Sequence, residues 1–407
     1  MKQLKRLTVL GFALCALWAL PQAHGQTRTD LMESARTDKE ANLTPETPPR
    51  AERDIERIEK SLPYRLFTGQ EHGFGVGFGS IVPGSSVALG ARYTRPLWSG
   101  KMILRVQALG SVNESYLGRL ELAMPHLFND HAFLTFNTTH RDISEMPYYG
   151  AGPNSRKTGR SDYRLEDTNV EVRPGVRIYK GLAATAIGSY LAENVGPGHS
   201  TRYISTEKQY GPDAAPGIHQ QTDFWRGGGL VGYDWRDDPS KPTSGGRYSA
   251  QYLRYLDRNL SHFSFYRVDL DAVQYIPLLN RTRVIVLHAA SSLTDTQNGQ
   301  QIPFYLQPIM GGPDTLRGFR YGRFYGNNSA MVNAEYRWFC SPTLEVAAFG
   351  DGGKVFNQWE QWNFHNLQSD VGFSLRFKGR TARTVFSFDT GFSHEGFQLW
   401  FHVNNLI

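Results

Sequence analysis

Hydrophobic and polar residues alternate with a period of two through much of this chain. In segment 331–339, apolar side chains occupy every second position from Val332 to Trp338, and the positions between them hold Asn333, Glu335 and Arg337. Segments 168–178 and 264–272 repeat the pattern. Because successive side chains of a β-strand point to opposite faces, the alternation predicts strands with one apolar and one charged face.

From residue 73 to the end, the alternation predicts sixteen strands separated by turns and loops. An even number of antiparallel strands returns the chain to the side on which it started. The expected strands are 73–81, 86–95, 101–111, 115–123, 131–140, 168–178, 183–192, 225–235, 246–256, 262–275, 282–292, 328–339, 343–351, 368–377, 383–391 and 396–403.

The connections between these strands sort by length. Those at one end are short, for example 179–182 and 340–342, and the long ones at the other end are 141–167, 193–224, 293–327 and 352–367. Short turns on one side and long loops on the other are typical of outer-membrane β-barrels, whereas a soluble β-sandwich has no reason to sort its loops in this way. We therefore expect an all-β fold in which residues 73–407 form a 16-stranded antiparallel transmembrane β-barrel.

The first 25 residues have the parts of a secretory signal peptide. Basic residues open the segment, residues 7–20 are apolar, and small residues precede the expected cleavage site after Gly25. The apolar run is shorter than the ~20 residues that a membrane-spanning helix needs. Residues 26–72 are polar, and we expect them to form a periplasmic lead with one short helix within 50–62.

Cysteine content and net charge limit the kinds of site and partner that the chain can have. Removal of residues 1–25 leaves Cys340 as the one cysteine, so we expect neither an internal disulfide nor a cysteine-based metal site. It also removes three of the 44 basic residues and none of the 38 acidic ones, which leaves 41 − 38 = +3. Because this balance is nearly neutral and the sequence has no basic tract with interleaved aromatic residues, we expect no nucleic-acid partner. Nothing in the sequence indicates a metal or another cofactor.

The usual catalytic motifs do not occur in the sequence. It contains no Gly-x-Ser-x-Gly, no His-Glu-x-x-His and no Cys-x-x-Cys, and His394-Glu395 has no second histidine at the right spacing. A Ser/His pair with His288 or His402 as the base is an alternative, but single histidines on strands are far more often wall residues. We therefore expect no enzymatic activity.

Three short motifs are more specific. Leu316-Arg317-Gly318-Phe319 lies in the long connection between the eleventh and twelfth strands, and Phe349-x-Asp351-x-Gly353 ends the thirteenth. Between the eighth and ninth strands stands Arg236-Asp237-Asp238-Pro239, followed by Pro242 and Gly245, and Glu335 on the twelfth strand adds a weaker match. In this order the motifs resemble those of the BamA/TamA outer-membrane assembly-factor family, also called the bacterial surface antigen family, and the resemblance covers residues 73–407.

The resemblance implies that the long loop folds into the barrel, where Arg317 meets Asp351. Such a pair is physically sound, because a guanidinium inside a barrel needs a carboxylate and can bind it with two hydrogen bonds. Gly318 permits close approach of the loop to the wall, Phe319 can wedge against the interior, and Glu335 can join the network. We expect the turn at 236–245 to be structural, because its prolines and glycines fix a tight reversal on the periplasmic side.

Glycines alternate through the first expected strand, at Gly73, Gly75, Gly77 and Gly79. Glycine weakens a strand, and in the family that the chain resembles the first and last strands meet at a seam thought to open towards lipid. We therefore place a seam between this strand and the last one, which carries Leu399 and Phe401. An equal alternative is that the glycines make room for an interior plug or for strong curvature.

The resemblance also implies a function. Members of the family typically carry periplasmic POTRA domains that receive unfolded clients, and residues 26–62 are too few to hold one. We expect a bacterial outer-membrane barrel, in contact with outer-membrane lipid, that assists insertion or translocation of proteins or lipids without an enzymatic step. Its partners would be client outer-membrane proteins and a separate periplasmic or POTRA-bearing protein. Two alternatives stay open: a passive channel narrowed by the Arg317 loop, and a structural subunit of an outer-membrane complex.

Overall fold

Two compact units make up the computed structural model of this chain, Met1–Lys60 and Ser61–Ile407. The structure describes residues 28–41, 57, 61, 72–279, 281–297, 299–363, 365–378 and 384–403. The first unit contains helix α2 (Arg28–Ala41). The short helix expected within 50–62 falls outside the described residues except at positions 57 and 61, and the expected signal peptide falls entirely outside them. No helix in the described ranges is long and apolar enough to span a membrane.

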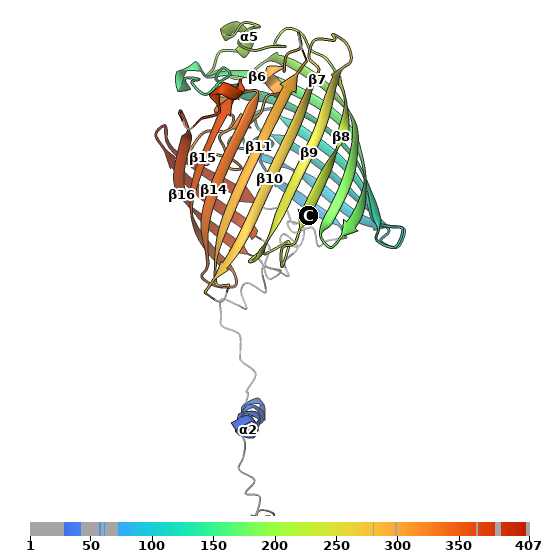
Figure 1. Cartoon of the computed structure of the whole chain (residues 1–407), viewed down its shortest axis with the longest axis vertical. Coiled ribbons are helices and arrows are strands. Elements are labelled where there is room, and N and C mark those ends of the chain that lie inside the picture. The colour runs from blue at the N-terminus through green and yellow to red at the C-terminus, as the bar shows by residue number, and fades with distance from the viewer. Residues whose placement is uncertain are drawn as a thin grey trace, which may run out of the picture. The chain divides into compact units, whose positions relative to one another are not determined.

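The second unit is a sheet of sixteen antiparallel strands that forms a nearly closed barrel (Figure 1). The strands pair in chain order, and a separate two-stranded ladder joins β12 (Ile309–Met310) to β13 (Phe324–Tyr325). This architecture confirms the expected 16-stranded antiparallel barrel. Its strands are β1 (Phe74–Gly79), β2 (Ala88–Leu97), β3 (Met102–Ser111), β4 (Tyr116–Leu127), β5 (Ala132–Tyr148), β6 (Ser161–Tyr179), β7 (Leu182–Pro197), β8 (Phe224–Asp234), β9 (Gly245–Asp257), β10 (Phe265–Leu278), β11 (Arg283–Thr296), β14 (Asn328–Phe339), β15 (Leu344–Phe356), β16 (Gln368–Lys378), β17 (Thr384–Ser393) and β18 (Gly396–Val403).

Short helical turns occupy parts of the long connections. They are η1 (Lys157–Gly159), α5 (Thr206–Gln209), η2 (Phe304–Leu306) and η3 (Trp359–Gln361). Each belongs to a different connection, and all four connections lie at the same end of the antiparallel sheet.

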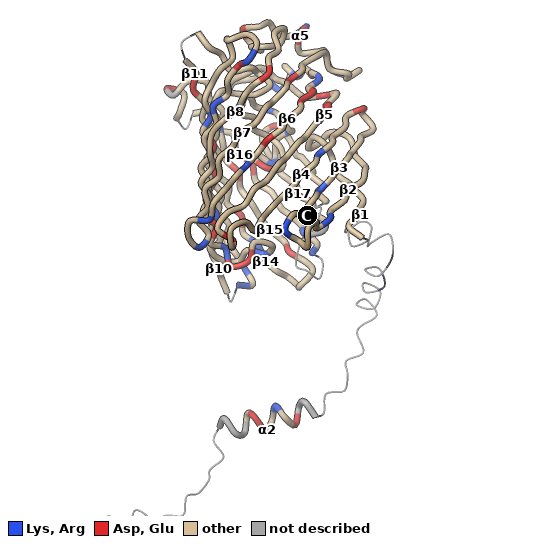
Figure 2. The backbone as a smooth tube through the Cα atoms, turned by 90° about the vertical axis from the view of Figure 1, so that its right-hand side faces the viewer, with Lys and Arg blue, Asp and Glu red and all other residues tan. Residues whose placement is uncertain are grey.

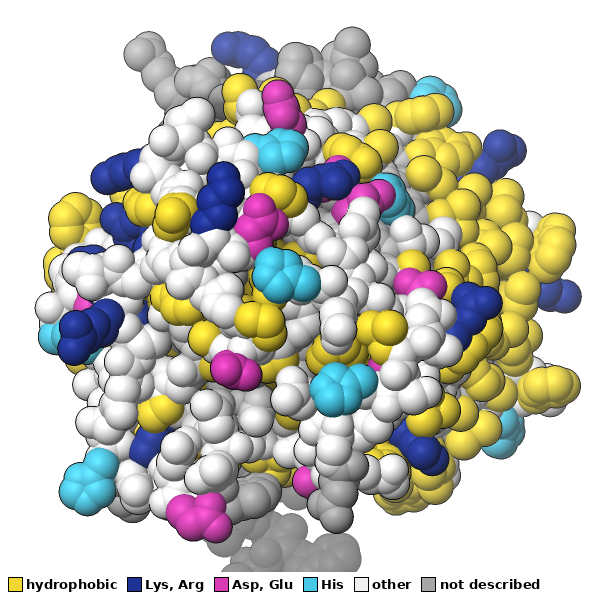
Figure 3. Space-filling view, turned by 90° about the horizontal axis from the view of Figure 1, so that it is seen from above, with side chains coloured by type: hydrophobic (Ala, Val, Ile, Leu, Met, Phe, Trp, Pro, Cys, Tyr) yellow, Lys and Arg dark blue, Asp and Glu magenta, His cyan; other side chains and the backbone are white. Residues whose placement is uncertain are grey.

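The strands turn their apolar side chains outwards and their charged side chains inwards. On β14, Val332, Tyr336 and Trp338 are exposed, whereas Glu335 between them is buried. Figure 3, seen from above, shows hydrophobic side chains gathered along one flank of the molecule. A soluble sheet with one solvated face has the opposite arrangement, because it packs its apolar face on the core. The alternation in the sequence is the same for a membrane barrel and for a soluble sheet. The outward direction of the apolar side chains in this barrel distinguishes the two.

Several strands extend beyond the expected bounds, among them β4, β7, β11 and β15, and the extensions are longest in β5 and β6. β5 continues to Tyr148 and β6 begins at Ser161, although the expected strands were 131–140 and 168–178. Residues near these added ends are buried on both faces of the strand. Because no solvated face requires polar residues there, the added segments lose the period-two pattern by which strands are recognised.

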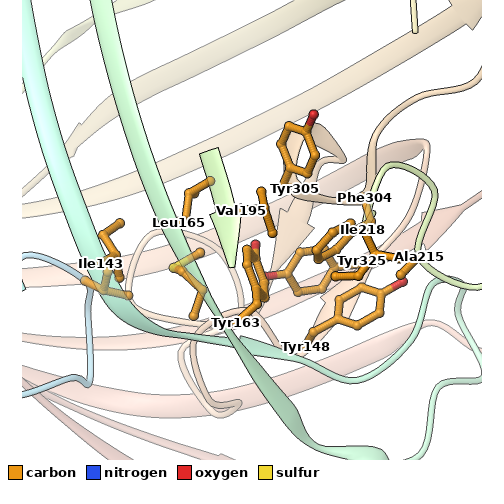
Figure 4. Packing of buried hydrophobic residues seen from close by; sticks show 12 residues of the cluster. Ile143, Tyr148, Tyr163, Leu165, Val195, Ala215, Ile218, Phe304, Tyr305 and Tyr325 are labelled. Carbon is orange, nitrogen blue, oxygen red and sulfur yellow. The ribbon is translucent and has the colours of Figure 1, made fainter. Parts of the chain in front are cut away.

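Aromatic side chains pack together where the long connections meet β5 and β6. The ring centroids of Tyr148 and Tyr325 are 4.9 Å apart, and those of Tyr163 and Phe304 are 4.7 Å apart (Figure 4). All four side chains are buried, and both pairs meet edge to face, the arrangement that aromatic rings favour. The cluster fixes the path of the β11–β14 connection across this end of the barrel.

The two ends of the sheet meet without a ladder of backbone hydrogen bonds. The pairing order runs from β1 to β18, and no pairing joins these two strands among the described residues. Figure 2 shows the backbone of the barrel from the side that carries the label of β1. Side chains bridge the junction, since the rings of Phe78 and Phe401 lie 6.3 Å apart. This junction is therefore weaker than any paired neighbours in the sheet.

The turn between β8 and β9 is organised by Asp237. Its carboxylate accepts hydrogen bonds from the backbone N–H groups of Thr243 at 2.9 Å and Ser244 at 3.1 Å and from the Thr243 hydroxyl at 2.5 Å. Burial by itself raises the pKa of the Asp237 carboxyl, but these hydrogen bonds outweigh burial and hold that pKa below its ordinary value. Gly245 has φ 91°, and a Cβ there would lie 2.4 Å from the carbonyl oxygen of Trp235.

Neighbouring residues support the same reversal. The guanidinium of Arg236 donates two hydrogen bonds to Asp234, at 2.9 and 2.6 Å, and a longer one of 3.4 Å to the carbonyl oxygen of Pro239. Asp238 accepts one hydrogen bond from the N–H of Ser240 at 2.7 Å. Pro242 precedes the hydrogen-bonded Thr243 in the sequence. These contacts fit the expected structural role of the turn.

Replacing Asp237 by alanine is expected to lower the free energy of unfolding by about 1–3 kcal/mol, because the bonded N–H groups lose a charged acceptor. The adjacent Asp238→Ala is the matched control, since it removes a single exposed hydrogen bond. The contribution of Asp237 is fully present above pH ~4 and is lost as the pH falls through its lowered folded-state pKa. Urea unfolding in detergent micelles between pH 7 and pH 2 should therefore show the two variants converging with the wild type at low pH. Equal losses for Asp237→Ala and Asp238→Ala at pH 7 would contradict this assignment.

Candidate functional site

The β11–β14 connection folds back on itself just before Arg317. The backbone N–H of Gly312 donates to the carbonyl oxygens of both Leu316 and Phe319 at 3.1 Å. Gly311 and Gly312 have φ values of 98° and 111°, which side-chain-bearing residues rarely adopt. The two glycines therefore allow the tight turn that brings Arg317 to β14 and β15.

Arg317 and Asp351 make a bidentate ion pair. The guanidinium donates from Nε to Asp351 Oδ2 at 2.9 Å and from Nη2 to Oδ1 at 2.8 Å. The backbone N–H of Arg317 donates to the same Oδ2 at 3.1 Å. The guanidinium also lies 3.3 Å from the centre of the Phe349 ring, a cation–π contact. Both members of the ion pair are buried, so each satisfies a charge that water does not reach.

Glu335 extends this pair into a network along the inner wall. It accepts a hydrogen bond from Arg317 Nη1 at 2.8 Å, one from Arg337 at 2.6 Å and two from Arg376 at 2.7 and 2.9 Å. Arg376 also donates to Glu345 at 2.7 Å. The loop arginine is thus tied to charged residues on β14, β15 and β16, and opposite charges alternate through the network.

Two glycines of the motifs make room for close packing. A Cβ at Gly318 would lie 2.5 Å from the Cβ of Asp370 on β16. A Cβ at Gly353 would lie 2.1 Å from the terminal methyl of Met310. A side chain at position 318 would therefore have to displace the loop or the wall, whereas at position 353 the flexible Met310 side chain would be displaced first.

The loop also makes an apolar contact with the wall. Leu316 and Phe319 are fully buried, and they pack with Met310, Phe324 and Met331 in one cluster. Phe319 meets Phe324 edge to face, with ring centroids 5.2 Å apart. The Leu-Arg-Gly-Phe motif therefore combines one buried ion pair with two buried hydrophobic anchors.

The last two strands hold the backbone of the motif. Trp400 on β18 donates from Nε1 to the carbonyl oxygen of Arg317 at 2.7 Å, and Ser393 on β17 donates from its hydroxyl to the carbonyl oxygen of Gly318 at 2.8 Å. A Cβ at Gly391 would lie 2.5 Å from the carbonyl carbon of Arg317. These contacts link the loop to the end of the sheet, next to its junction with β1.

The glycines of β1 and Gly73, which directly precedes it, have different surroundings. Gly73 has φ 85°, and a Cβ there would lie 2.0 Å from a carbonyl oxygen of the neighbouring strand. Gly75 and Gly77 are buried within the strand, and a Cβ at Gly77 would lie 2.5 Å from a leucine of β3. At Gly79, which ends β1, a Cβ would meet no described atom within 4 Å. Contact with the neighbouring backbone thus accounts for Gly73, whereas the contact at Gly77 is with the end of a flexible side chain.

The residues of β1 and β18 that were expected to form the seam differ in exposure. Leu399 and Phe401 are 63% and 46% exposed, on the outer face of β18, whereas Gly75 and Gly77 are buried. Phe78 is one of the β1 residues near β18, since its ring lies 6.3 Å from that of Phe401.

Sequence reasoning named the motif residues but missed several that hold them. Arg376 and Trp400 face inwards, and the residues on either side of each are apolar and face outwards. The alternation in the sequence was therefore sufficient to predict that both face inwards. It could not indicate their partners, because hydrogen bonds across the barrel join residues far apart in the chain. No group of three or more His, Cys, Asp or Glu side chains suited to a metal occurs in the described part of the chain.

Arg317→Ala is expected to lower the free energy of unfolding by about 3 kcal/mol or more, because it leaves the Asp351 carboxylate buried without its cation. Arg317→Lys should fall between wild type and alanine, since lysine keeps the charge but not the bidentate geometry. The matched control is Arg320→Ala, which removes an exposed arginine three residues away. Urea unfolding followed by tryptophan fluorescence measures all three. If Arg317→Ala costs no more than Arg320→Ala, the buried network does not stabilise the barrel.

Known proteins with this fold share the barrel at low sequence identity. The crystal structure of BamA from Haemophilus ducreyi lacking POTRA domains 1–3 matches with 17% identity over 81% of this chain and 70% of that chain, at a TM-score of 0.61. CdiB from Escherichia coli matches with 12% identity over 81% of this chain and 61% of that chain, at a TM-score of 0.52. CdiB from Acinetobacter baumannii matches with 13% identity over 79% of this chain and 57% of that chain, at a TM-score of 0.50. These similarities are similarities of fold.

Sequence comparison adds the family. No curated protein sequence matches the chain significantly. The family model described as the Omp85 superfamily domain matches residues 84–398, which is well over half of the chain and includes the Arg317 motif, its Asp351 partner and the β8–β9 turn. The chain therefore belongs to the Omp85 superfamily.

Proposed function

We propose that this chain is a bacterial outer-membrane barrel that assists the insertion or translocation of proteins or lipids at that membrane, without an enzymatic step. The junction between β1 and β18 is the route in this proposal. Its separation would let a client strand or a lipid pass between the barrel interior and the bilayer.

The single observation that carries the proposal is that no ladder joins β1 to β18 among the described residues. Every other pair of neighbouring strands in the sheet is joined by backbone hydrogen bonds. Opening the barrel between β1 and β18 therefore breaks fewer backbone hydrogen bonds than opening it elsewhere. Exposed strand edges also attract other strands, because their N–H and C=O groups lack partners. A client strand can pair with such an edge in the same way that a peptide adds to a sheet.

The outward apolar face supports placement in a membrane. Val332, Val371 and Phe373 are each more than 60% exposed, and similar side chains cover the neighbouring strands. In water such a surface would be unfavourable, whereas in a bilayer it contacts lipid tails.

We further propose that the β11–β14 connection is folded into the lumen as a plug. The contacts of Arg317 with inward-facing Asp351 and Glu335 support this arrangement. A plugged lumen also weighs against the passive channel, the main alternative. A stable open pore in planar bilayers that widens in Arg317→Ala would favour the channel instead.

The proposed partners follow from the family rather than from contacts in the chain. Client outer-membrane proteins would meet the β1–β18 junction, and a separate periplasmic or POTRA-bearing protein would deliver them. Recovery of such a protein after crosslinking in cells supports this part of the proposal.

The experiment that tests the route is a disulfide across the junction. Phe78→Cys with Phe401→Cys, in a Cys340→Ser background, places two thiols where the two rings now lie 6.3 Å apart. The structure favours this pair over Gly77 with Leu399, because Gly77 is buried and Leu399 is exposed. We expect oxidation to abolish assembly of an outer-membrane client in cells and in proteoliposomes, and reductant to restore it.

A second disulfide provides the matched control. Phe388→Cys with Phe401→Cys links positions that are already direct partners in the β17–β18 ladder and are both exposed. This crosslink should form without loss of activity. If the Phe78–Phe401 crosslink forms efficiently and activity is unchanged, the junction does not open during function and the proposed route is wrong.

A further inference from the structure

The outer face of the barrel wall is hollowed across six neighbouring strands, β8, β9, β10, β11, β14 and β15 (Figure 1). We call this cavity of about 840 Å³ the outer hollow. Val332, which faces outwards and is 61% exposed, is paired with Ala289 on one side and Gly352 on the other, so all three share the outer face. Five strands each contribute one small residue to the floor of the outer hollow: Ala250, Ala272, Ala289, Ala330 and Gly352.

Larger apolar side chains border this floor. Val231, Leu270 and Val332 rise beside the small residues, and all three are exposed on the outside of the barrel. Trp362 and Leu367 of the β15–β16 connection close one end of the outer hollow. Because these borders are apolar, the outer hollow suits a hydrocarbon chain better than a polar ligand.

The polar groups of the lining already have partners within the chain. Lys354, on the outward side of β15, donates to the carbonyl oxygens of Asn363 at 3.3 Å and His365 at 2.6 Å. These hydrogen bonds hold the β15–β16 connection against the outer face of the wall. The hydroxyl of Tyr248 donates to Gln274. Neither group therefore requires a hydrogen bond from a ligand.

An exposed arginine lies on the same face above the outer hollow. Arg254 is four residues beyond Ala250 on β9, towards the end of the barrel that carries the long connections, which places it about 13 Å away. Its guanidinium lies 5.4 Å from the centre of the Tyr266 ring. No carboxylate pairs with Arg254 in the part of the chain that the structure describes, so its charge is free to meet an anion.

Tyrosines separate the arginine from the small residues. The rings of Tyr252 and Tyr266 stack with their centroids 6.0 Å apart, on the outer face between Arg254 and the outer hollow. Tyrosine is enriched where the hydrocarbon of a membrane meets the polar headgroups. This level of the wall therefore places Arg254 among the headgroups and the outer hollow beside the acyl chains.

A phospholipid with a net negative charge fits both features. Arginine binds phosphate through charge-assisted hydrogen bonds, and an acyl chain fills an apolar cavity without needing any. A second copy of the chain is a poorer match, because a symmetric contact through this wall would bring two unpaired Arg254 side chains towards each other. We propose that the outer hollow binds one anionic phospholipid, with an acyl chain over the small residues and the phosphate at Arg254. The inference rests on the proposed membrane placement and not on the proposed route between β1 and β18.

Native mass spectrometry of the purified full-length protein tests the headgroup. The detergent micelles contain equal amounts of phosphatidylglycerol and phosphatidylcholine with the same acyl chains. We expect one retained phospholipid, with phosphatidylglycerol favoured about fivefold, because one arginine near the membrane surface gives a preference of that size. Arg254→Gln should abolish the preference. Arg283→Gln is the matched control, since Arg283 also lies over an aromatic ring, that of Trp338 at 5.1 Å, but at the opposite end of the wall.

Substitutions in the floor test the acyl chain. Ala289→Leu should lower the fraction of protein that carries a lipid about fivefold or more, because the added side chain takes the space of the acyl chain. Ala334→Leu is its control, since Ala334 is exposed on β14 outside the outer hollow. Ala272→Leu, at the position paired with Ala289, replaces the first variant if that one fails to give a folded barrel by gel mobility.

Four results would overturn the proposal: no retained lipid in the wild type, equal retention of the two lipids, unchanged retention in the floor variants, or a dimer without lipid. The last result would assign the outer hollow to a second copy of the chain. A junction that stays closed during function would change none of these measurements, because the outer hollow and the junction lie on different strands.

Discussion

Burial of the Arg317 charge is the constraint on which the rest of this barrel depends. A guanidinium removed from water is tolerable only when a carboxylate meets it with good geometry. Asp351 meets that need with two side-chain hydrogen bonds, and Glu335 adds a third from the neighbouring strand. Since each acid is also held in its own ladder, the register of β14 and β15 and the position of the loop are determined together.

Most of the fold could be predicted from the alternation of apolar and polar residues in the sequence. Every outward residue of β14 from Val332 to Trp338 was assigned to the correct face, and the sorted connection lengths indicated a barrel rather than a sandwich. The motif at 316–319 and its neighbour Asp351 were identified through a family whose membership the Omp85 match confirms. These features are local in sequence, and they follow from strand geometry or from short motifs.

Features that depend on contacts distant in sequence could not be obtained in this way. Residues near the added ends of β5 and β6 are buried on both faces of the strand, so the sequence there lacks the alternation that marks a strand. Helix α2 lies in a segment rich in charged residues with only a few apolar ones. The sequence therefore predicted no helix there, and predicted one within 50–62, where apolar residues have a weak helical spacing. Gly77 and Leu399 stay a prediction as seam positions, because β1 and β18 are not paired among the described residues and no register relates their residues.

The hydrogen bond from Trp400 to the Arg317 carbonyl oxygen gives the two edges of the junction unequal freedom. β18 is attached to the loop, and through the loop to β14, β15 and β16, so its position is coupled to those strands. β1 carries no comparable attachment among the contacts described, and its backbone is paired on one side only, to β2. Under the proposed function, separation of the edges would therefore be asymmetric: β1 would move away from β18, which the loop holds in place.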